Sequence, residues 1–125
     1  MSLKLKVAQK DMEEGDLKEC RRRVQEMGFT CELAADWSSF KTEEQCKKLY
    51  NYAFTDIESA LSSGFKHDKL IQDTFNAAVK KIEVGISDAE TKLSLDGDTF
   101  KVLVNFDNNG CVQSSKVHEY LMDVL

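Results

Sequence analysis

Proline is absent from the 125 residues of this chain. Because proline is a common cause of helix kinks and a main component of semi-rigid linkers, the sequence predicts neither feature. Internal repeats, low-complexity tracts and shifts in composition that would mark a domain boundary are missing as well. We therefore predict a single globular domain over residues 1–125, a length that can bury one core without disulfides or metals.

Long apolar runs are also lacking. No segment of the sequence is long and apolar enough to span a bilayer, so we expect no membrane contact. Residues 1–10 carry three lysines but no apolar stretch of the kind that secretory signal peptides have. These two features predict a cytoplasmic protein. The net charge of -5 argues against general nucleic-acid binding, which usually needs a basic surface.

Paired cysteine motifs are missing, although the chain has four cysteines, at Cys20, Cys31, Cys46 and Cys111. The spacing C-x-x-C, which zinc sites and thioredoxin-like sites use, does not occur. Cys20 and Cys46 lie on the apolar stripes of expected helices, where cysteine acts as a small hydrophobic residue. We expect four reduced thiols and no zinc site, with two disulfides as the alternative.

Familiar catalytic and cofactor motifs are missing too. The sequence contains no G-x-S-x-G, no G-x-G-x-x-G and no Walker A segment. Only two histidines are present, His67 and His118, each followed by a carboxylate residue. We therefore expect no enzymatic activity and no cofactor. The alternative is a small enzyme whose site is assembled in space around His67 or His118, with Cys31 or Cys111 as the nucleophile.

A calcium loop is the nearest approach to a metal motif. Asn105, Asp107 and Asn109 occupy alternate positions before Gly110, as oxygen ligands do in an EF-hand loop. The position that should supply a bidentate glutamate holds Lys116, whose positive charge opposes a cation. The sequence therefore predicts a turn between strands here, and no metal site.

The first third of the chain contains patterns of regular secondary structure. Residues 3–8 alternate apolar residues with lysine, which favours a strand, and residues 29–33 favour another. Residues 16–27 have apolar side chains at helical spacing, and Gly28 is a good terminator for that helix. Together these segments predict an N-terminal β-α-β unit.

Two longer helices are expected in the middle of the chain. Thr42 and Gln45 have the spacing of a capping box, which predicts a helix over residues 43–61. A further helix is predicted over residues 68–83, with Gly85 as its end. Because the connection between these helices is short, we expect them to be antiparallel neighbours.

The last third predicts a β-hairpin followed by a helix. Residues 91–95 and 100–106 alternate between polar and apolar, and Asp96-Gly97-Asp98 between them is a tight-turn signal. Residues 117–125 again have helical spacing. The predicted fold class is therefore α+β, with a small, mostly antiparallel sheet and helices packed on one of its faces.

Three consecutive arginines, Arg21, Arg22 and Arg23, give one alternative function. Arginine pairs well with phosphate, so a nucleic-acid regulator would use such a helix. However, Glu14 and Glu19 lie within the same two turns, and no aromatic residue is interleaved to stack on bases. We therefore expect a solvated helix face and no nucleic-acid partner.

The remaining candidates are aromatic and acidic residues that would contact another protein. Trp37 and Phe40 lie in a polar loop, and Asp96, Asp98 and Asp107 cluster around the hairpin turns. An acidic surface would complement a basic partner. We interpret the chain as a small acidic protein-binding module without chemistry of its own, such as an inhibitor, an immunity or antitoxin protein, or an adaptor. A homo-oligomer is compatible with the same sequence.

Overall fold

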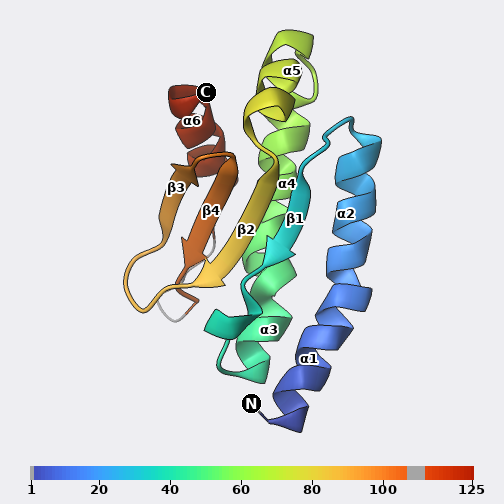
Figure 1. Ribbon diagram of the computed structural model, residues 1–125, viewed down its shortest axis with the longest axis vertical. Coiled ribbons are helices and arrows are strands. Elements are labelled where there is room, and N and C mark those ends of the chain that lie inside the picture. Colours follow the sequence, from blue (N-terminus) through green and yellow to red (C-terminus); the bar gives the residue numbers. More distant parts are fainter. Residues whose placement is uncertain (1, 107–111) are drawn as a thin grey trace.

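The computed structural model describes residues 2–106 and 112–125. Within them the chain has an α+β fold, in which one four-stranded sheet packs against a group of helices (Figure 1). The elements follow in the order α1 (Leu3–Glu14), α2 (Asp16–Glu26), β1 (Glu32–Ala35), η1 (Trp37–Ser39), α3 (Glu43–Leu49), η2 (Tyr50–Phe54), α4 (Thr55–Ala60), η3 (Leu61–Phe65), α5 (Lys69–Ala78), β2 (Lys81–Ile86), β3 (Lys92–Asp96), β4 (Thr99–Val104) and α6 (Ser114–Val124).

The sheet is mixed, with the strand order β1-β2-β4-β3. β2 pairs in parallel with both β1 and β4, whereas β3 and β4 form the antiparallel pair of the expected hairpin. The α+β class is therefore confirmed, and the prediction of a mostly antiparallel sheet is wrong. The sequence-based prediction lacks β2, the central strand that makes both parallel pairs.

β2 lies where periodicity predicts the end of a helix over residues 68–83. α5 ends at Ala78, and Val79 already has extended backbone angles, with φ -110° and ψ 112°. Ile82 fits the helical stripe that continues from Phe75 and Val79, and together with Val84 it also fits the buried face of a strand, so local spacing does not decide between the two. Tertiary packing decides, because a position between β1 and β4 buries Ile82 and Val84 completely.

The N-terminal segment is a helix, so the predicted strand over residues 3–8 and its β-α-β unit are wrong. α1 begins after Ser2, whose Oγ accepts a hydrogen bond from the backbone N–H of Leu5 at 3.1 Å. The buried residues Leu5, Ala8 and Met12 recur at helical spacing, and α1 packs against α3. Alternation over only six residues is too short to exclude this helical pattern.

The helix predicted after Thr42 is present and is longer than expected. The Thr42 Oγ1 accepts a hydrogen bond from Gln45 N–H at 3.1 Å, and the Gln45 side chain caps the Thr42 N–H in return. Helical structure continues over residues 43–65, with the π-helical segments η2 and η3 inserted. η2 contacts α2, and Gly64 of η3 lies against His118 of α6. The π turns therefore lie where this helix meets two others.

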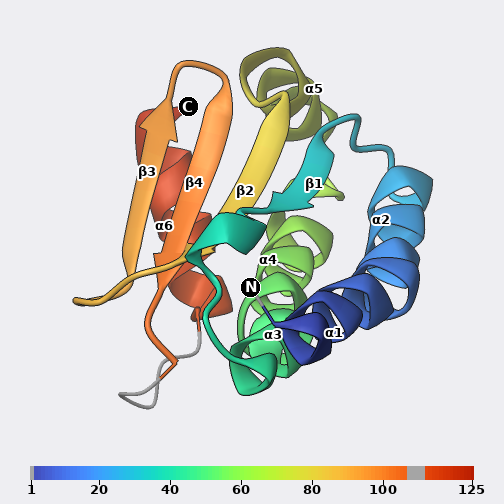
Figure 2. The ribbon, with the colours of Figure 1, turned by 60° about the horizontal axis from the view of Figure 1, so that its bottom comes forward.

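The two faces of the sheet differ in burial. Ile82 of β2 and its register partner Phe100 of β4 are fully buried, and helices lie behind this face (Figure 2). Glu83 and its register partner Lys101 point to the opposite face and keep part of their surface exposed. This alternation agrees with the expectation that helices cover one face of the sheet. α1 and α2 lie beyond β1 in the same view.

A hydrophobic core joins these elements. The Phe75 ring of α5 lies 5.4 Å from the Phe29 ring and 5.7 Å from the Phe65 ring, measured between centroids. These edge-on contacts connect α5 to the segment after α2 and to η3. Among the described residues, no helix has the length and apolarity needed to cross a membrane.

Candidate functional site

Trp37 lies in η1, directly after β1, and its side chain is half-buried. Its Nε1–H donates a hydrogen bond to Glu13 Oε1 of α1 at 2.8 Å, and its ring packs against Phe40 with 4.9 Å between centroids. Phe40 itself is only 1% exposed. The two aromatic candidates are therefore neighbours, but Phe40 belongs to the core and Trp37 alone keeps surface that a partner can reach.

Glu13 connects Trp37 with the first arginine of the triplet. Arg21 Nη1 donates to Glu13 Oε2 at 2.7 Å, and Arg21 Nε donates to the Leu33 carbonyl of β1 at 2.9 Å. Burial by itself would raise the pKa of Glu13, but hydrogen bonds from Arg21 and Trp37 bring that pKa below its usual value. The cluster joins α1, α2, β1 and η1, and its polar groups bind one another.

The other two arginines are also held by carboxylates. Arg22 pairs with Glu19 at 3.1 Å and with Glu26 at 2.7 Å, both within α2. Arg23 pairs with Glu58 of α4 at 2.8 Å. Because each guanidinium of the triplet faces a carboxylate of this chain, the three do not form the uninterrupted basic face that nucleic-acid binding requires.

A partly buried polar cluster surrounds the Arg23–Glu58 pair. The Tyr50 hydroxyl accepts a hydrogen bond from Arg23 Nη2 at 2.8 Å and donates one to Glu58 Oε1 at 3.2 Å. Burial alone would raise the pKa of Glu58, but hydrogen bonds from Arg23, Cys20 and Tyr50 lower it below its ordinary value. Because these groups satisfy one another's hydrogen-bonding capacity, we interpret the cluster as a structural contact that connects α2 with α4.

The three cysteines within the described residues are buried free thiols. Burial and the hydrogen bond to Glu58 raise the pKa of Cys20 well above its usual range, and burial raises the pKa of Cys31 to about 11. Burial also raises the pKa of Cys46. A thiol that stays protonated at neutral pH is a poor nucleophile, so Cys31 is not activated. Cys111, the other candidate nucleophile, lies outside the described residues.

The two histidines occupy different surroundings. His67 lies in the exposed turn before α5. His118 is half-buried on α6, and its ring lies edge-on to Phe65 with 5.4 Å between centroids. His118 is therefore part of the contact between α6 and η3. Within the described residues, neither histidine forms an ion pair or a hydrogen bond that would resemble a catalytic arrangement.

Residues 2–106 and 112–125 contain neither a metal-binding cluster nor an unsatisfied buried polar side chain. No group of three or more His, Cys, Asp or Glu side chains is placed to hold a metal ion. No buried side-chain nitrogen or oxygen there lacks a hydrogen-bond partner. A buried polar atom without a partner would have pointed to a missing ligand. The calcium-like positions at 107, 109 and 110 lie outside the described residues.

The acidic candidates Asp96 and Asp98 flank Gly97 in the turn between β3 and β4, and both are exposed. Gly97 has φ 63°, a backbone conformation that favours glycine. The Asp96 carboxylate lies 3.3 Å from Lys101 Nζ of β4. This turn and η1 lie at opposite ends of the sheet, so the acidic and aromatic candidates do not form one surface (Figure 2). Asp107 lies outside the described residues.

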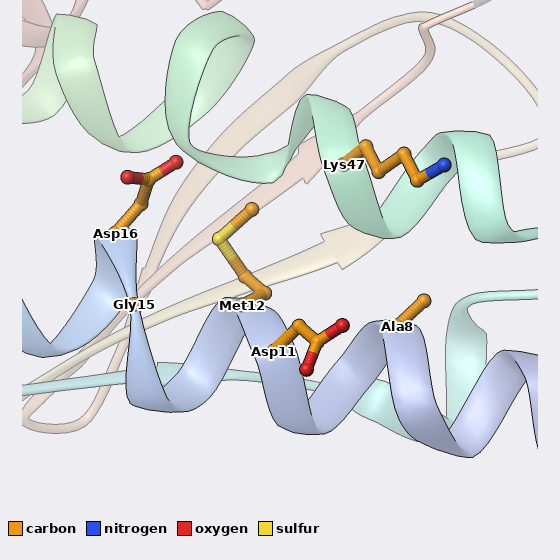
Figure 3. Close-up of a pocket in the computed structure, with 6 residues that line it drawn as sticks. All are labelled: Ala8, Asp11, Met12, Gly15, Asp16 and Lys47. Atoms are coloured by element: carbon orange, nitrogen blue, oxygen red, sulfur yellow. The ribbon is translucent and has the colours of Figure 1, made fainter.

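A pocket of about 330 Å³ with three charged residues in its lining lies between α1 and α3 (Figure 3). The figure shows Asp11 and Asp16 on the side of α1 and α2, and Lys47 on the side of α3. All three charged residues are exposed. A ligand in this pocket would meet solvent-exposed charges, which bind weakly, and no second feature of the pocket indicates a ligand.

A groove of a different kind lies between α5 and α6. Its volume is about 170 Å³, and its lining is almost entirely apolar. Phe65 and Leu121 are buried at its base, whereas Leu70 of α5 and Met122 of α6 are 76% and 49% exposed. The lining residues are Phe65, Leu70, Ile71, Thr74, Leu121, Met122 and Leu125. Among the surfaces described above, this groove alone brings large apolar side chains together in reach of solvent.

Comparison of the chain with protein-family models, with curated proteins and with solved structures finds no match. The groove was not singled out by sequence analysis, because helical spacing alone assigns Leu70 and Leu121 to buried stripes. The neighbouring pairs Leu70-Ile71 and Leu121-Met122 were an available signal. Adjacent residues of a helix point in directions about 100° apart, so one member of such a pair can lie at the edge of the buried stripe and stay exposed.

Proposed function

We propose that this protein binds another protein, and that the groove between α5 and α6 is the contact surface. The observation that carries the proposal is the exposure of Leu70 and Met122 above the buried residues Phe65 and Leu121. Exposed apolar side chains that share one groove gain free energy when a partner removes them from water. Trp37 of η1 and the turn residues Asp96 and Asp98 do not line the groove, and they are secondary contacts in this proposal.

The size of the groove favours a side chain of a protein over a free small molecule. Pockets for small molecules usually measure roughly 300–1,000 Å³, and this groove measures about 170 Å³. It has room for one or two large apolar side chains, as an amphipathic helix would present. Lys69 and Asp123, the chain neighbours of Leu70 and Met122, are exposed and supply charges of both signs for selectivity.

The net charge of -5 favours a partner with an overall positive charge, because long-range attraction speeds association. Inhibitors, immunity or antitoxin proteins and adaptors of the cytoplasm share this combination of small size, acidity and an apolar contact surface. The alternative functions have less support. The arginine triplet is neutralised by carboxylates of α1, α2 and α4, and the described cysteines are not activated.

The proposal is tested by quantitative affinity capture from a native cell extract, with the protein immobilised and bound proteins measured by mass spectrometry. Met122→Glu places a charge at the rim of the groove, and we expect it to reduce capture of the specific partner by about tenfold or more. Because Met122 is 49% exposed, the variant should keep the circular dichroism spectrum of the wild type.

Val7→Glu is the matched control, since Val7 of α1 is also about half exposed and lies away from the groove. It should leave capture unchanged. Equal capture by wild type and by Met122→Glu, or equal loss with both variants, would contradict the assignment of the groove.

A further inference from the structure

The two edge strands of the sheet, β1 and β3, differ in whether another element lies beside them. At the β1 edge, Arg21 Nε of α2 donates a hydrogen bond to the Leu33 carbonyl at 2.9 Å, and α2 lies beside the strand (Figure 2). At the other edge, β3 is the outermost strand, and no described element lies beyond it in Figure 1 or Figure 2. Unpaired N–H and C=O groups of an edge strand are a template for pairing with another strand.

The hairpin geometry determines which backbone groups of β3 face outward. A two-residue turn, Gly97 and Asp98, joins Asp96 to its register partner Thr99. Residues that flank such a turn exchange both backbone hydrogen bonds, and the direction then alternates along the strand. Lys92, Ser94 and Asp96 therefore bond to β4, and the N–H and C=O groups of Leu93 and Leu95 point away from the sheet.

The side chains of β3 divide between the two faces of the sheet. Leu93 and Leu95 are half-buried and pack against the core. Lys92, Ser94 and Asp96 lie on the opposite face, where Lys92 is exposed and the Asp96 side chain is 74% exposed. The strand thus presents a positive charge at one end, a negative charge at the other, and a small polar residue at its centre.

This pattern is self-complementary. We propose that β3 pairs antiparallel with β3 of a second copy of this chain across a two-fold axis, with Ser94 directly opposite Ser94 of the second copy. In this arrangement Lys92 of each copy lies opposite Asp96 of the other, which gives two ion pairs on the same face. The outward groups of Leu93 bond with those of Leu95 of the second copy, so the pairing makes four backbone hydrogen bonds.

Charge selects this register over its neighbours. Only Leu93, Leu95 and every second residue beyond them offer outward backbone groups. In any alternative register the residue opposite a given residue of β3 therefore changes by two positions. A shift one way places Asp96 opposite Glu90 of the second copy, which are like charges. A shift the other way places Ser94 opposite Asp96, and Lys92 opposite Asp98 in the turn. The register centred on Ser94 alone pairs both charged residues of β3 with opposite charges inside the strand.

The interface follows the usual form of an isologous dimer, in which the same surface of both copies takes part. Because β3 has five residues, the buried area is small, and the dimer is expected to be weak and reversible. It would join two sheets into one continuous sheet of eight strands. The groove between α5 and α6 takes no part in this pairing. Evidence against the dimer would therefore not count against the proposed partner site, and the reverse also holds.

Sedimentation equilibrium over a range from micromolar to millimolar protein tests the pairing. The wild type should pass from monomer to dimer as its concentration rises. Lys92→Asp converts both attractive pairs into repulsive ones, and it should weaken the dimer by about tenfold or more. The double variant Lys92→Asp with Asp96→Lys makes opposite charges face each other again between the copies. It should recover part of the affinity, because it also replaces the Asp96–Lys101 pair within each copy by two like charges.

Lys4→Asp is the matched control for the change in net charge. Lys4 is exposed on α1, and its replacement by Asp changes the net charge by the same amount as Lys92→Asp. It should leave the dimer unchanged. A wild type that stays monomeric at millimolar concentration, or a dimer that Lys92→Asp does not weaken, would overturn the proposal.

The register itself is tested by cross-linking at the two-fold axis. Ser94→Cys, in a Cys111→Ser background, should form an intermolecular disulfide with oxidised glutathione, because Cα atoms of a non-hydrogen-bonded antiparallel pair lie about 4.5 Å apart. Ser115→Cys, at an exposed position of α6, is the control in the same background and should cross-link far more slowly. Equal rates for the two variants would refute the register.

Discussion

Individual charged side chains hold the helices of this protein to one another. Arg21 and Arg23, both on α2, reach Glu13 of α1 and Glu58 of α4. The Arg23 guanidinium makes two hydrogen bonds with the Glu58 carboxylate, at 2.8 and 3.0 Å, which is the strong bidentate geometry. Because the Glu58 side chain is only 17% exposed, solvent weakens this pair less than it weakens the ion pairs of the helix surface.

Glu58→Gln should therefore reduce both stability and its dependence on pH. The pKa of Glu58 is lowered in the folded state, so its contribution is present above the unfolded pKa and is lost as pH falls through the folded pKa. The variant should be less stable by roughly 1–3 kcal/mol at pH 7. Urea unfolding measured from about pH 7 to pH 3 should show a smaller loss of stability below about pH 5 in the variant.

Glu26→Gln is the control for this experiment. Glu26 also pairs with an arginine, Arg22, but its side chain is 64% exposed. We expect a change within about 0.5 kcal/mol, as is typical of surface substitutions. Parallel pH profiles for wild type and Glu58→Gln would show that the Arg23–Glu58 pair does not stabilise the fold.

At the scale of elements, the long helical segment over residues 43–65 contains two π turns that lie at its contacts with other helices. η3 places Gly64 against α6, and a Cβ added at Gly64 would lie 2.9 Å from His118 Nε2. The His118 ring has little freedom to move, because it also packs edge-on against Phe65. Glycine at position 64 therefore allows the close approach of η3 and α6.

Gly64→Ala should destabilise the protein by about 1–3 kcal/mol, because it overpacks this contact. In a His118→Ala background the same substitution should be neutral or stabilising, since alanine is a better helix former by roughly 1 kcal/mol. Urea denaturation of the four proteins gives the coupling energy. A cost of Gly64→Ala that is the same in both backgrounds would mean that His118 is not the group it meets.

Elements with long and consistent patterns could be predicted from the sequence, and short ambiguous ones could not. The capping box at Thr42 and the turn at Gly97 fix their elements by local chemistry, and both are present. The strand β2 was missed because Ile82 suits either a helical stripe or, together with Val84, the buried face of a strand. The candidate groove was missed for a related reason, because one helix does not show which element will cover Leu70 or Met122.

At the scale of the whole molecule, β2 links the two halves of the chain. It pairs with β1 from the first half and with β4 from the C-terminal hairpin. The buried side chains of both halves belong to one hydrophobic cluster. We therefore predict that residues 1–125 unfold as one cooperative unit.

Trp37, the only tryptophan of the chain, tests that prediction. Its fluorescence reports on the contact of η1 with α1, and far-ultraviolet circular dichroism reports on all helices and strands. At micromolar concentration, where the proposed dimer would be dissociated, the two urea unfolding curves should coincide. Midpoints that differ between the two probes would indicate more than one folding unit and contradict the single-domain prediction.

The sequence by itself determined the α+β class, the hairpin and most helices, because these depend on neighbours only a few residues apart. The tertiary structure decided that β2 is a central parallel strand, that residues 3–8 form a helix, and that Phe40 is buried while Leu70 is exposed. The physical reason is that burial and strand pairing depend on residues distant in the chain. Local periodicity carries no information about which distant element will pack against a helix or pair with a strand.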